Sequence, residues 1–181
     1  MDGGARIDFV RGPTRRYRSV LHRPDGVQVA LDGGSYDKVG GGAGEVPHDL
    51  AHLIVEDELD LRLGVWGVLL VGGLFRHAEV VAGRQRPHAA RRGREAIAAA
   101  GDRIMQAEIL TRAACDLSAA GADRNVAAVR RAVGERWWSE SVTTEALERS
   151  CRRLRAAGEA WARLAPGEAL VESWRRPPAK P

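Results

Sequence analysis

The sequence predicts an α+β fold in which a small antiparallel sheet packs against four or five helices. Three observations lead to this prediction. Over residues 5–32, apolar and polar side chains alternate in short segments, as in strands with one buried face. From Pro47 onwards the apolar spacing is typical of helices. A last alternating segment, residues 168–174, could return to the N-terminal sheet as a further strand.

Three strands are predicted near the N-terminus, at residues 5–11, 16–22 and 27–32. In the first, apolar residues alternate with arginine and aspartate, which places the apolar side chains on one face. The segment Arg23–Gly26 has proline at its second position and glycine at its last, a pattern typical of a tight turn. Residues 33–45 are rich in glycine and predict a flexible loop.

A helix is expected to start at Pro47 and to run to about Leu63. Proline is favourable in the first turn of a helix, because its missing N–H would have no partner there. Asp49 adds a negative charge beside the positive end of the helix dipole. Residues 65–75 indicate a short buried helix, although a strand stays open, and residues 77–83 indicate a short strand.

The remaining chain is predicted to be almost wholly helical. A long alanine-rich helix is expected over about residues 88–120, ended by Gly121, and another over about 123–137. A last helix, at about 144–164, is expected to begin at a Thr143 or Thr144 cap. Its apolar residues form one seam, made of Leu147, Cys151, Leu154 and Trp161.

The composition is that of a globular chain. Of 181 residues, 44% are hydrophobic and 29% are charged, so we expect a single domain over residues 1–174 and a disordered tail over 175–181. The longest apolar run, residues 65–75, is far shorter than the ~20 residues that span a membrane. No signal peptide is visible, and the two cysteines, Cys115 and Cys151, lie in predicted helices. A cytoplasmic, reducing location is therefore expected.

The positive charge of the chain says little about its partners. The net charge is +4, and arginine supplies nearly all of the cations, since lysine occurs only at Lys38 and Lys180. Residues 84–94 are locally basic and contain Arg84, Arg86, Arg91, Arg92 and Arg94. No aromatic residues are interleaved with these arginines, so the segment favours a solvated helix start over a nucleic-acid-binding surface.

The segment His48-Asp49-Leu50-Ala51-His52 has the form H-D-x-x-H. It resembles the H-E-x-x-H motif of zinc metallopeptidases, in which two histidines one helical turn apart bind zinc and the acid activates water. The resemblance implies that His48 and His52 are ligands and that Asp49 is a catalytic base or orients the site. Aspartate is one methylene shorter than the glutamate of that motif. With Glu56, the helix also resembles those of small uncharacterised bacterial proteins with an H-D-x-x-H-x-x-x-E pattern.

The helical spacing places His48, His52 and Glu56 on one stripe, at about 0°, 40° and 80°. Glu56 is about 12 Å along the helix from His48, too far for both to bind one ion easily. Glu56 is therefore expected to orient His52 from behind. The stripe continues with apolar residues such as Leu59, which indicates that this face packs against another part of the chain.

The third ligand of such a site must come from elsewhere in the chain. His77 and Glu79 are the nearest candidates in sequence, and Glu108, in the middle of a predicted helix, is a more distant one. A metal-free pair of hydrogen-bonded histidines, or histidines placed on the surface by accident, are the structural alternatives. The Gly40–Gly44 loop precedes the helix, but no Lys-Ser/Thr follows it, so a mobile loop is favoured over a phosphate-binding one.

Two functions follow from these patterns. The first is a metal-binding protein, with zinc as the first expectation, that hydrolyses a small-molecule or peptide substrate. The second is a non-catalytic binding or assembly domain, which would associate through its helical face and Trp137/Trp138, and could form a homo-oligomer. Neither nucleic acid nor a membrane is an expected partner. A third ligand that converges on the histidine pair would discriminate between the two functions.

Overall fold

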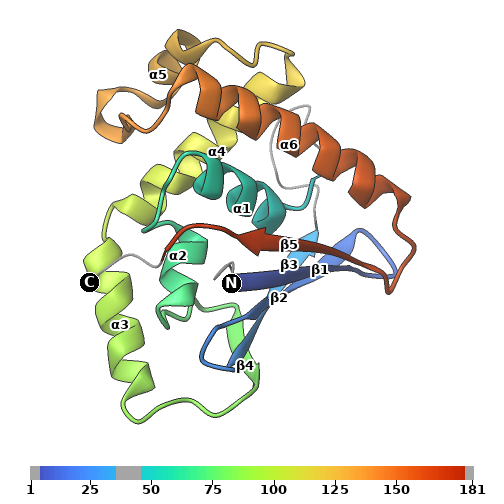
Figure 1. The fold of residues 1–181 in the computed structure, drawn as a ribbon, viewed down its shortest axis with the longest axis vertical. Helices are drawn as coiled ribbons and strands as arrows, with labels where there is room; N and C mark the ends of the chain where they lie inside the picture. Colours follow the sequence, from blue (N-terminus) through green and yellow to red (C-terminus); the bar gives the residue numbers. More distant parts are fainter. Residues whose placement is uncertain (1–4, 36–45, 178–181) are drawn as a thin grey trace.

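The computed structural model describes residues 5–35 and 46–177 and confirms the α+β class. In these residues, five strands form one antiparallel sheet with the order β4-β3-β2-β1-β5. The strands are β1 (Ala5–Arg11), β2 (Arg16–His22), β3 (Gln28–Ser35), β4 (Ala78–Ala82) and β5 (Ala169–Trp174). The helices are α1 (His48–Glu58), α2 (Val65–Leu70), α3 (Ala89–Ala100), α4 (Arg103–Ala119), α5 (Val126–Val133), the short 3-10 helix η2 (Glu135–Trp137) and α6 (Thr144–Arg163). In Figure 1, α1, α4 and α6 lie together on one side of the sheet.

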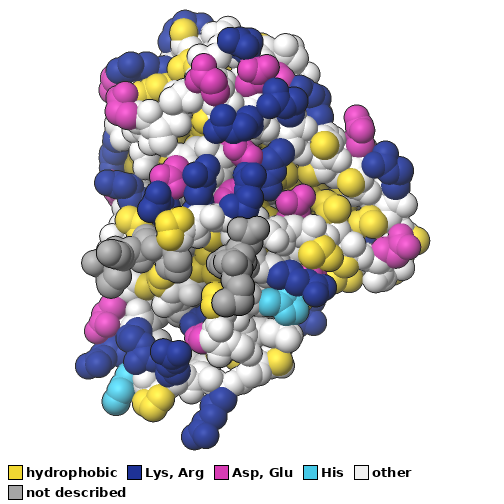
Figure 2. Space-filling model, in the orientation of Figure 1, with side chains coloured by type: hydrophobic (Ala, Val, Ile, Leu, Met, Phe, Trp, Pro, Cys, Tyr) yellow, Lys and Arg dark blue, Asp and Glu magenta, His cyan; other side chains and the backbone are white. Residues whose placement is uncertain are grey.

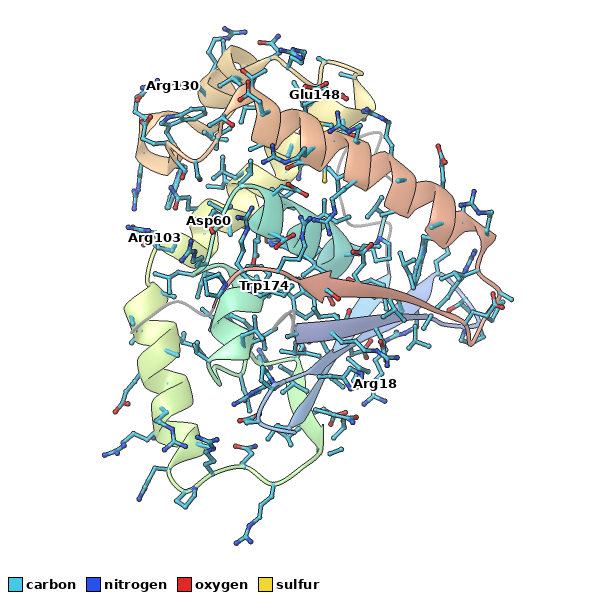
Figure 3. The ribbon with its side chains drawn as sticks, viewed as in Figure 1. Arg18, Asp60, Arg103, Arg130, Glu148 and Trp174 are labelled. Carbon is cyan, nitrogen blue, oxygen red and sulfur yellow. The ribbon has the colours of Figure 1, made fainter. Side chains whose placement is uncertain are left out.

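The alternation in the N-terminal strands places one apolar row against the helices. Ile7 pairs with Leu21, and Leu21 pairs with Val29, so the three fully buried side chains cross neighbouring strands at one level. The predicted C-terminal strand does return to the sheet, because β5 pairs antiparallel with β1. Trp174 at the end of β5 is buried in the core (Figure 3). The sheet thus brings the two ends of the described chain side by side.

Several predicted boundaries differ from the observed ones, and backbone conformation explains each difference. Helix α1 ends at Glu58 rather than near Leu63, because Asp60 adopts a left-handed φ of 55° that a helix cannot continue through. The predicted helix over 88–120 is two helices, since Gly101 has a φ of 51° between α3 and α4. Gly134, with a φ of 73°, likewise ends α5 before η2.

Other predicted elements agree with the structure. Helix α6 starts after Thr143, whose side chain accepts a hydrogen bond from the Ala146 N–H, and its predicted apolar seam is buried. Strand β3 continues to Ser35, three residues beyond its predicted end, and most of the predicted glycine-rich loop lies outside the described residues. Among the described helices, none is both long enough and apolar enough to cross a membrane.

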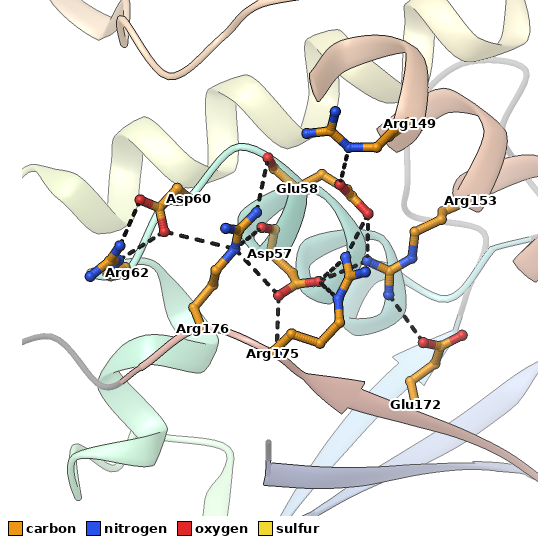
Figure 4. A network of polar contacts seen from close by, with 9 residues as sticks. All are labelled: Asp57, Glu58, Asp60, Arg62, Arg149, Arg153, Glu172, Arg175 and Arg176. Carbon is orange, nitrogen blue, oxygen red and sulfur yellow. Dashed lines mark hydrogen bonds and ion pairs between the residues drawn. The ribbon is translucent and has the colours of Figure 1, made fainter. Parts of the chain in front are cut away.

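Helix α1 is the central helix of the fold. Its residues from Leu50 to Glu58 are buried, and it packs against α4 and α6. Its last turn carries Asp57 and Glu58, two negative charges at the end of a helix where the dipole disfavours them. Four arginines from α6 and from the segment after β5 surround these carboxylates (Figure 4). They are Arg149, Arg153, Arg175 and Arg176.

These ion pairs fix the end of α1 in the interior. Arg153 Nη1 lies 2.8 Å from Asp57 Oδ2 and 3.0 Å from Glu58 Oε1. Arg175 Nη2 donates to Glu58 Oε1 at 2.6 Å, and Arg176 Nε donates to the Asp57 carbonyl at 2.6 Å. Arg175 and Arg176, at the start of the expected C-terminal tail, are therefore bound to α1. Residues 178–181 lie outside the described part. A rigid α1 in turn holds the histidines at its other end.

Candidate metal centre

Two helices bring three potential metal ligands together. His48 is the first residue of α1, and His52 follows one helical turn later, so their rings lie on the same face with centroids 4.5 Å apart. Helix α4 packs against α1 and brings Glu108 to the pair. One nitrogen of each histidine and one oxygen of Glu108 all lie within 4.8 Å of one another.

The distances within this group suit a single small ion. His52 Nε2 lies 2.9 Å from Glu108 Oε2, and His48 Nε2 lies 3.3 Å from Glu108 Oε1. Ligand atoms around a tetrahedral zinc, with bonds of about 2.1 Å, are separated by roughly 3.4 Å. Both observed distances are therefore close to the ligand–ligand separation around such an ion.

Each histidine has a second carboxylate at its other ring nitrogen. His52 Nδ1 lies 2.9 Å from Glu56 Oε1, the contact expected from the helical spacing. His48 Nδ1 lies 3.6 Å from Asp49 Oδ1, a looser ion-pair distance. Both Nε2 atoms thus face Glu108, whereas both Nδ1 atoms face another acid. Histidine ligands of metals usually donate their second ring N–H to such a carboxylate, which fixes the ring orientation.

Glu56 is held rigidly in the core. It has no exposed surface, and its carboxylate also accepts hydrogen bonds from the backbone N–H groups of Val65 at 2.9 Å and Trp66 at 3.0 Å. These N–H groups begin α2, where a helix has unpaired donors and a positive dipole end. Gly64 packs closely against it, because a Cβ there would lie 2.4 Å from Glu56 Cδ. Helix α2 therefore fixes the carboxylate that orients His52.

Asp49 lies on the Nδ1 side of His48. Its Oδ2 accepts a hydrogen bond from Ser19 Oγ at 2.8 Å, and its backbone N–H donates to the Tyr17 hydroxyl at 3.1 Å. Burial and the Asp49 charge raise the pKa of Tyr17 far above its ordinary value, so the phenol stays neutral. Of the two roles expected for Asp49, this geometry favours orientation of His48, and the role as a base stays a prediction.

The three acids change the proton affinity of the histidines. Burial lowers the pKa of His52, but hydrogen bonds to Glu108 and Glu56 outweigh burial and raise it to about 10. The pKa of His48 is also raised, first by Asp49 and then by Glu108. In return, hydrogen bonds from His48 and His52 lower the pKa of Glu108. A metal ion must therefore compete with protons for these nitrogens.

The group is buried on one side and open to solvent on the other. The exposed fraction of the side chain is 1% for His52, 35% for His48 and 49% for Glu108. Three protein ligands leave at least one position of a tetrahedral ion for water or another ligand. The exposed His48 and Glu108 show that this position would be reached from solvent. The group therefore differs from a closed set of four protein ligands.

The two ligands expected nearest in sequence are not part of this group. Glu79, in β4, accepts a hydrogen bond from Arg18 at 2.9 Å, and His77 is exposed just before the same strand. Glu108, the more distant candidate, takes the third place. Its signal in the sequence is a glutamate beside Ile104 and Ala107 in a helix. That signal does not reveal which helix α4 contacts.

The tryptophan pair of the alternative function packs against its own chain. Gln106 Nε2 donates to the carbonyls of Trp137 at 3.2 Å and Trp138 at 2.9 Å. Arg136 lies over the Trp137 ring at 4.6 Å, and Arg130 lies over the Trp138 ring at 5.1 Å. Both rings are only partly buried, and the alternative function stays a prediction.

Comparisons of this chain with protein-family models, with curated proteins and with solved structures found no match. The relevant observations are the converging ligand atoms, the acids behind them and the accessible side of the group.

Proposed function

We propose that this chain binds a divalent transition-metal ion through His48 Nε2, His52 Nε2 and the Glu108 carboxylate. One observation carries the proposal: both Nε2 atoms converge on one carboxylate while each Nδ1 atom faces a different one. A simple surface ion pair between a histidine and an acid needs neither the second histidine nor the buried acid behind it. A metal site uses all of these groups.

The charges around the histidines support a doubly charged occupant. Glu108, Glu56 and Asp49 bring three negative charges to two histidines. Two neutral imidazoles and one dication would balance these acids as well as two imidazolium ions do. Replacement of two protons by one divalent ion therefore leaves the net charge of the group unchanged. This equality removes a large electrostatic cost from metal binding.

Zinc is the ion that we expect first. Two imidazoles and one carboxylate form the ligand set of several catalytic zinc sites, although the same set also suits iron(II) and manganese. Zinc would supply a bound water of lowered pKa for hydrolysis of a small-molecule or peptide substrate. In this proposal Glu56 and Asp49 hold the histidine rings in place, and the exposed side of Glu108 faces the substrate.

The metal content of the untagged protein, purified without a chelator, tests this proposal. We expect about one metal ion per chain in the parent and none in the His48→Ala/His52→Ala variant. A His77→Ala/Glu79→Ala variant is the matched control, because it removes one histidine and one acid that lie outside the group. Circular dichroism must show that each variant is folded.

A metal-free structural role makes the opposite prediction. In that case the parent contains no metal, and its Tm does not change when zinc, iron(II) or manganese is added. The histidine variant would then lose only the hydrogen bonds between α1 and α4. That combination of results would reject the proposed function.

A further inference from the structure

A small pocket lies between three segments at the end of the molecule opposite α5 and α6. The turn between β2 and β3, the end of α2 and the start of α3 form its walls. Its interior volume is only about 20 Å³, and the empty volume rises to about 280 Å³ when the open solvent at its mouth is included. Charged residues at the pocket are Arg23, Asp25, Arg86 and Arg92. In Figure 2, arginine side chains gather over the end of the molecule where α3 begins.

Positive charge at this pocket exceeds negative charge. Three arginines face one aspartate, and Asp25 is already engaged by Arg23 Nη2 at 2.7 Å. Arg86 makes no ion pair with any described residue. Arg92 donates one hydrogen bond to the Pro87 carbonyl at 2.7 Å and likewise has no carboxylate partner in residues 5–35 and 46–177. Two guanidinium groups therefore remain available for an anion.

The third guanidinium, that of Arg23, is largely buried in the pocket wall. The side chain of Arg23 is only 15% exposed, and its Nε is fully buried without a hydrogen-bond partner among the described residues. A buried donor of this kind is costly unless a partner completes it. Its terminal nitrogens lie 3.6 Å from where a Cβ on Gly72 would be. Arg23 thus contributes a mostly buried positive charge to the pocket wall, paired with one aspartate.

The start of α3 adds to the positive potential. This helix has no acidic residue in its first turn, and no side chain caps its N-terminus at His88. Gly93 lets α3 approach the end of α2 closely, because a Cβ there would lie 2.5 Å from the Gly72 carbonyl oxygen. The close contact fixes the position of Arg92, the arginine of α3 at the pocket, relative to Arg23.

We propose that this pocket binds a compact dianion, either free phosphate or the phosphoryl group of a small phosphate monoester. Planar guanidinium groups bind phosphate oxygens in pairs, which suits three arginines around one group. The interior has room for about one water molecule, so the anion would lie at the pocket mouth between the exposed guanidinium groups. The small mouth and the absence of aromatic side chains from the pocket wall favour a single phosphoryl group over a nucleotide or a nucleic acid strand. The proposal is independent of the metal centre.

The test is a titration of the folded protein by isothermal calorimetry. Inorganic phosphate and glycerol phosphate are compared with sodium chloride at equal ionic strength. We expect saturable phosphate binding that is at least about tenfold weaker in the Arg86→Ala/Arg92→Ala variant. The Arg84→Ala/Arg94→Ala variant is the matched control, since it removes two exposed arginines of the same segment that do not line the pocket. We expect its affinity to stay within about twofold of the parent.

The same titrations in the His48→Ala/His52→Ala protein exclude phosphate that binds to a metal ion. Retained binding in that variant supports the arginine pocket even if the metal proposal fails. A monoester affinity more than about tenfold above that of phosphate identifies a phosphorylated small molecule as the ligand, and equal affinities identify free phosphate. A parent response equal to that of sodium chloride overturns the proposal. Equal weakening of phosphate binding in the two arginine variants also overturns the proposal, because it indicates a diffuse basic surface. A short single-stranded DNA that binds more tightly than phosphate, and that depends on Arg84 and Arg94, overturns it for the same reason.

Discussion

Glu56 shows how one buried side chain serves two elements. Its carboxylate accepts hydrogen bonds from the first N–H groups of α2 and contacts the Nδ1 atom of His52 on α1. Water cannot replace these partners, because Glu56 has no exposed surface. Three hydrogen-bond contacts and the positive end of α2 surround the carboxylate. The orientation of His52 therefore depends on the packing of a neighbouring helix.

We expect Glu56→Gln to weaken metal binding by about 10–100-fold, because a glutamine amide cannot accept all three hydrogen bonds. The unsatisfied backbone donors should also destabilise the fold by about 1–3 kcal/mol. Competition with a chelator of known affinity measures the first effect, and urea denaturation measures the second. Glu79→Gln, at an exposed acid of β4, is the control and should change neither quantity. Unchanged metal affinity in a folded Glu56→Gln protein would contradict the role of Glu56.

Gly64 tests the packing around the same carboxylate. A methyl group there would approach Glu56 Cδ to 2.4 Å, although the φ of −74° is accessible to alanine. We expect Gly64→Ala to destabilise the protein by about 1–3 kcal/mol through overpacking, since backbone strain does not contribute. Gly158→Ala, whose Cβ would meet only Val46 Cγ2 at 3.3 Å, should cost less. Urea denaturation of both variants measures the difference, and equal midpoints would contradict this packing argument.

At the scale of elements, the proposed ion joins α1 to α4. His48 and His52 come from α1, Glu108 comes from α4, and the two helices are far apart in the sequence. Both helices also contribute apolar side chains to the core, among them Leu53 of α1 and Ala107 of α4. A metal ion would add a link that exists only in the folded chain.

Metal binding is therefore expected to stabilise the protein. At a free metal concentration about 100 times the dissociation constant, the gain is about 2.7 kcal/mol. Differential scanning calorimetry with added zinc, and with a chelator, measures this as a shift in Tm. Glu108→Ala should remove the shift. Because it also leaves the buried Nε2 of His52 without its partner, the chelated variant should have a lower Tm than the chelated parent, so the zinc-induced shift is compared within each protein. A zinc-induced shift that persists in Glu108→Ala would place the ion elsewhere.

The sequence predicts elements better than it predicts contacts between them. The strand pattern of Ile7 and Phe9, and the spacing of His48, His52 and Glu56, are local regularities that follow from two periods, 2.0 and 3.6 residues. The helix ends at Asp60 and Gly101 each depend on one positive φ angle. The residues on either side favour a helix, so their pattern does not reveal these ends. Glu108 could be proposed only among several acids, because its place beside α1 depends on the packing of α4.

At the scale of the whole molecule, the opposite end of α1 is an ionic junction. Asp57 and Glu58 lie under the guanidinium groups of Arg149, Arg153 and Arg175, which come from α6 and from the chain after β5 (Figure 4). The junction connects the central helix to the last helix and to the C-terminal strand. Its carboxylates are buried, so the loss of their charge would leave arginines without partners. The fold should consequently be sensitive to acid.

Acid sensitivity follows from the sign of the Glu58 shift. Burial alone would raise the pKa of Glu58, but hydrogen bonds from Arg149, Arg175 and Arg153 lower it to about 2. Because the unfolded chain protonates this group near its ordinary pKa of 4.5, the stabilisation is complete above pH 4.5 and is lost as the pH falls towards 2.

We expect the free energy of unfolding of Glu58→Gln to be lower than that of the parent at pH 7 and to fall less steeply below pH 4.5. Urea denaturation at several pH values measures both, with Glu79→Gln as a control that should follow the parent. Parallel pH profiles for Glu58→Gln and the parent would show that the junction does not contribute to acid sensitivity.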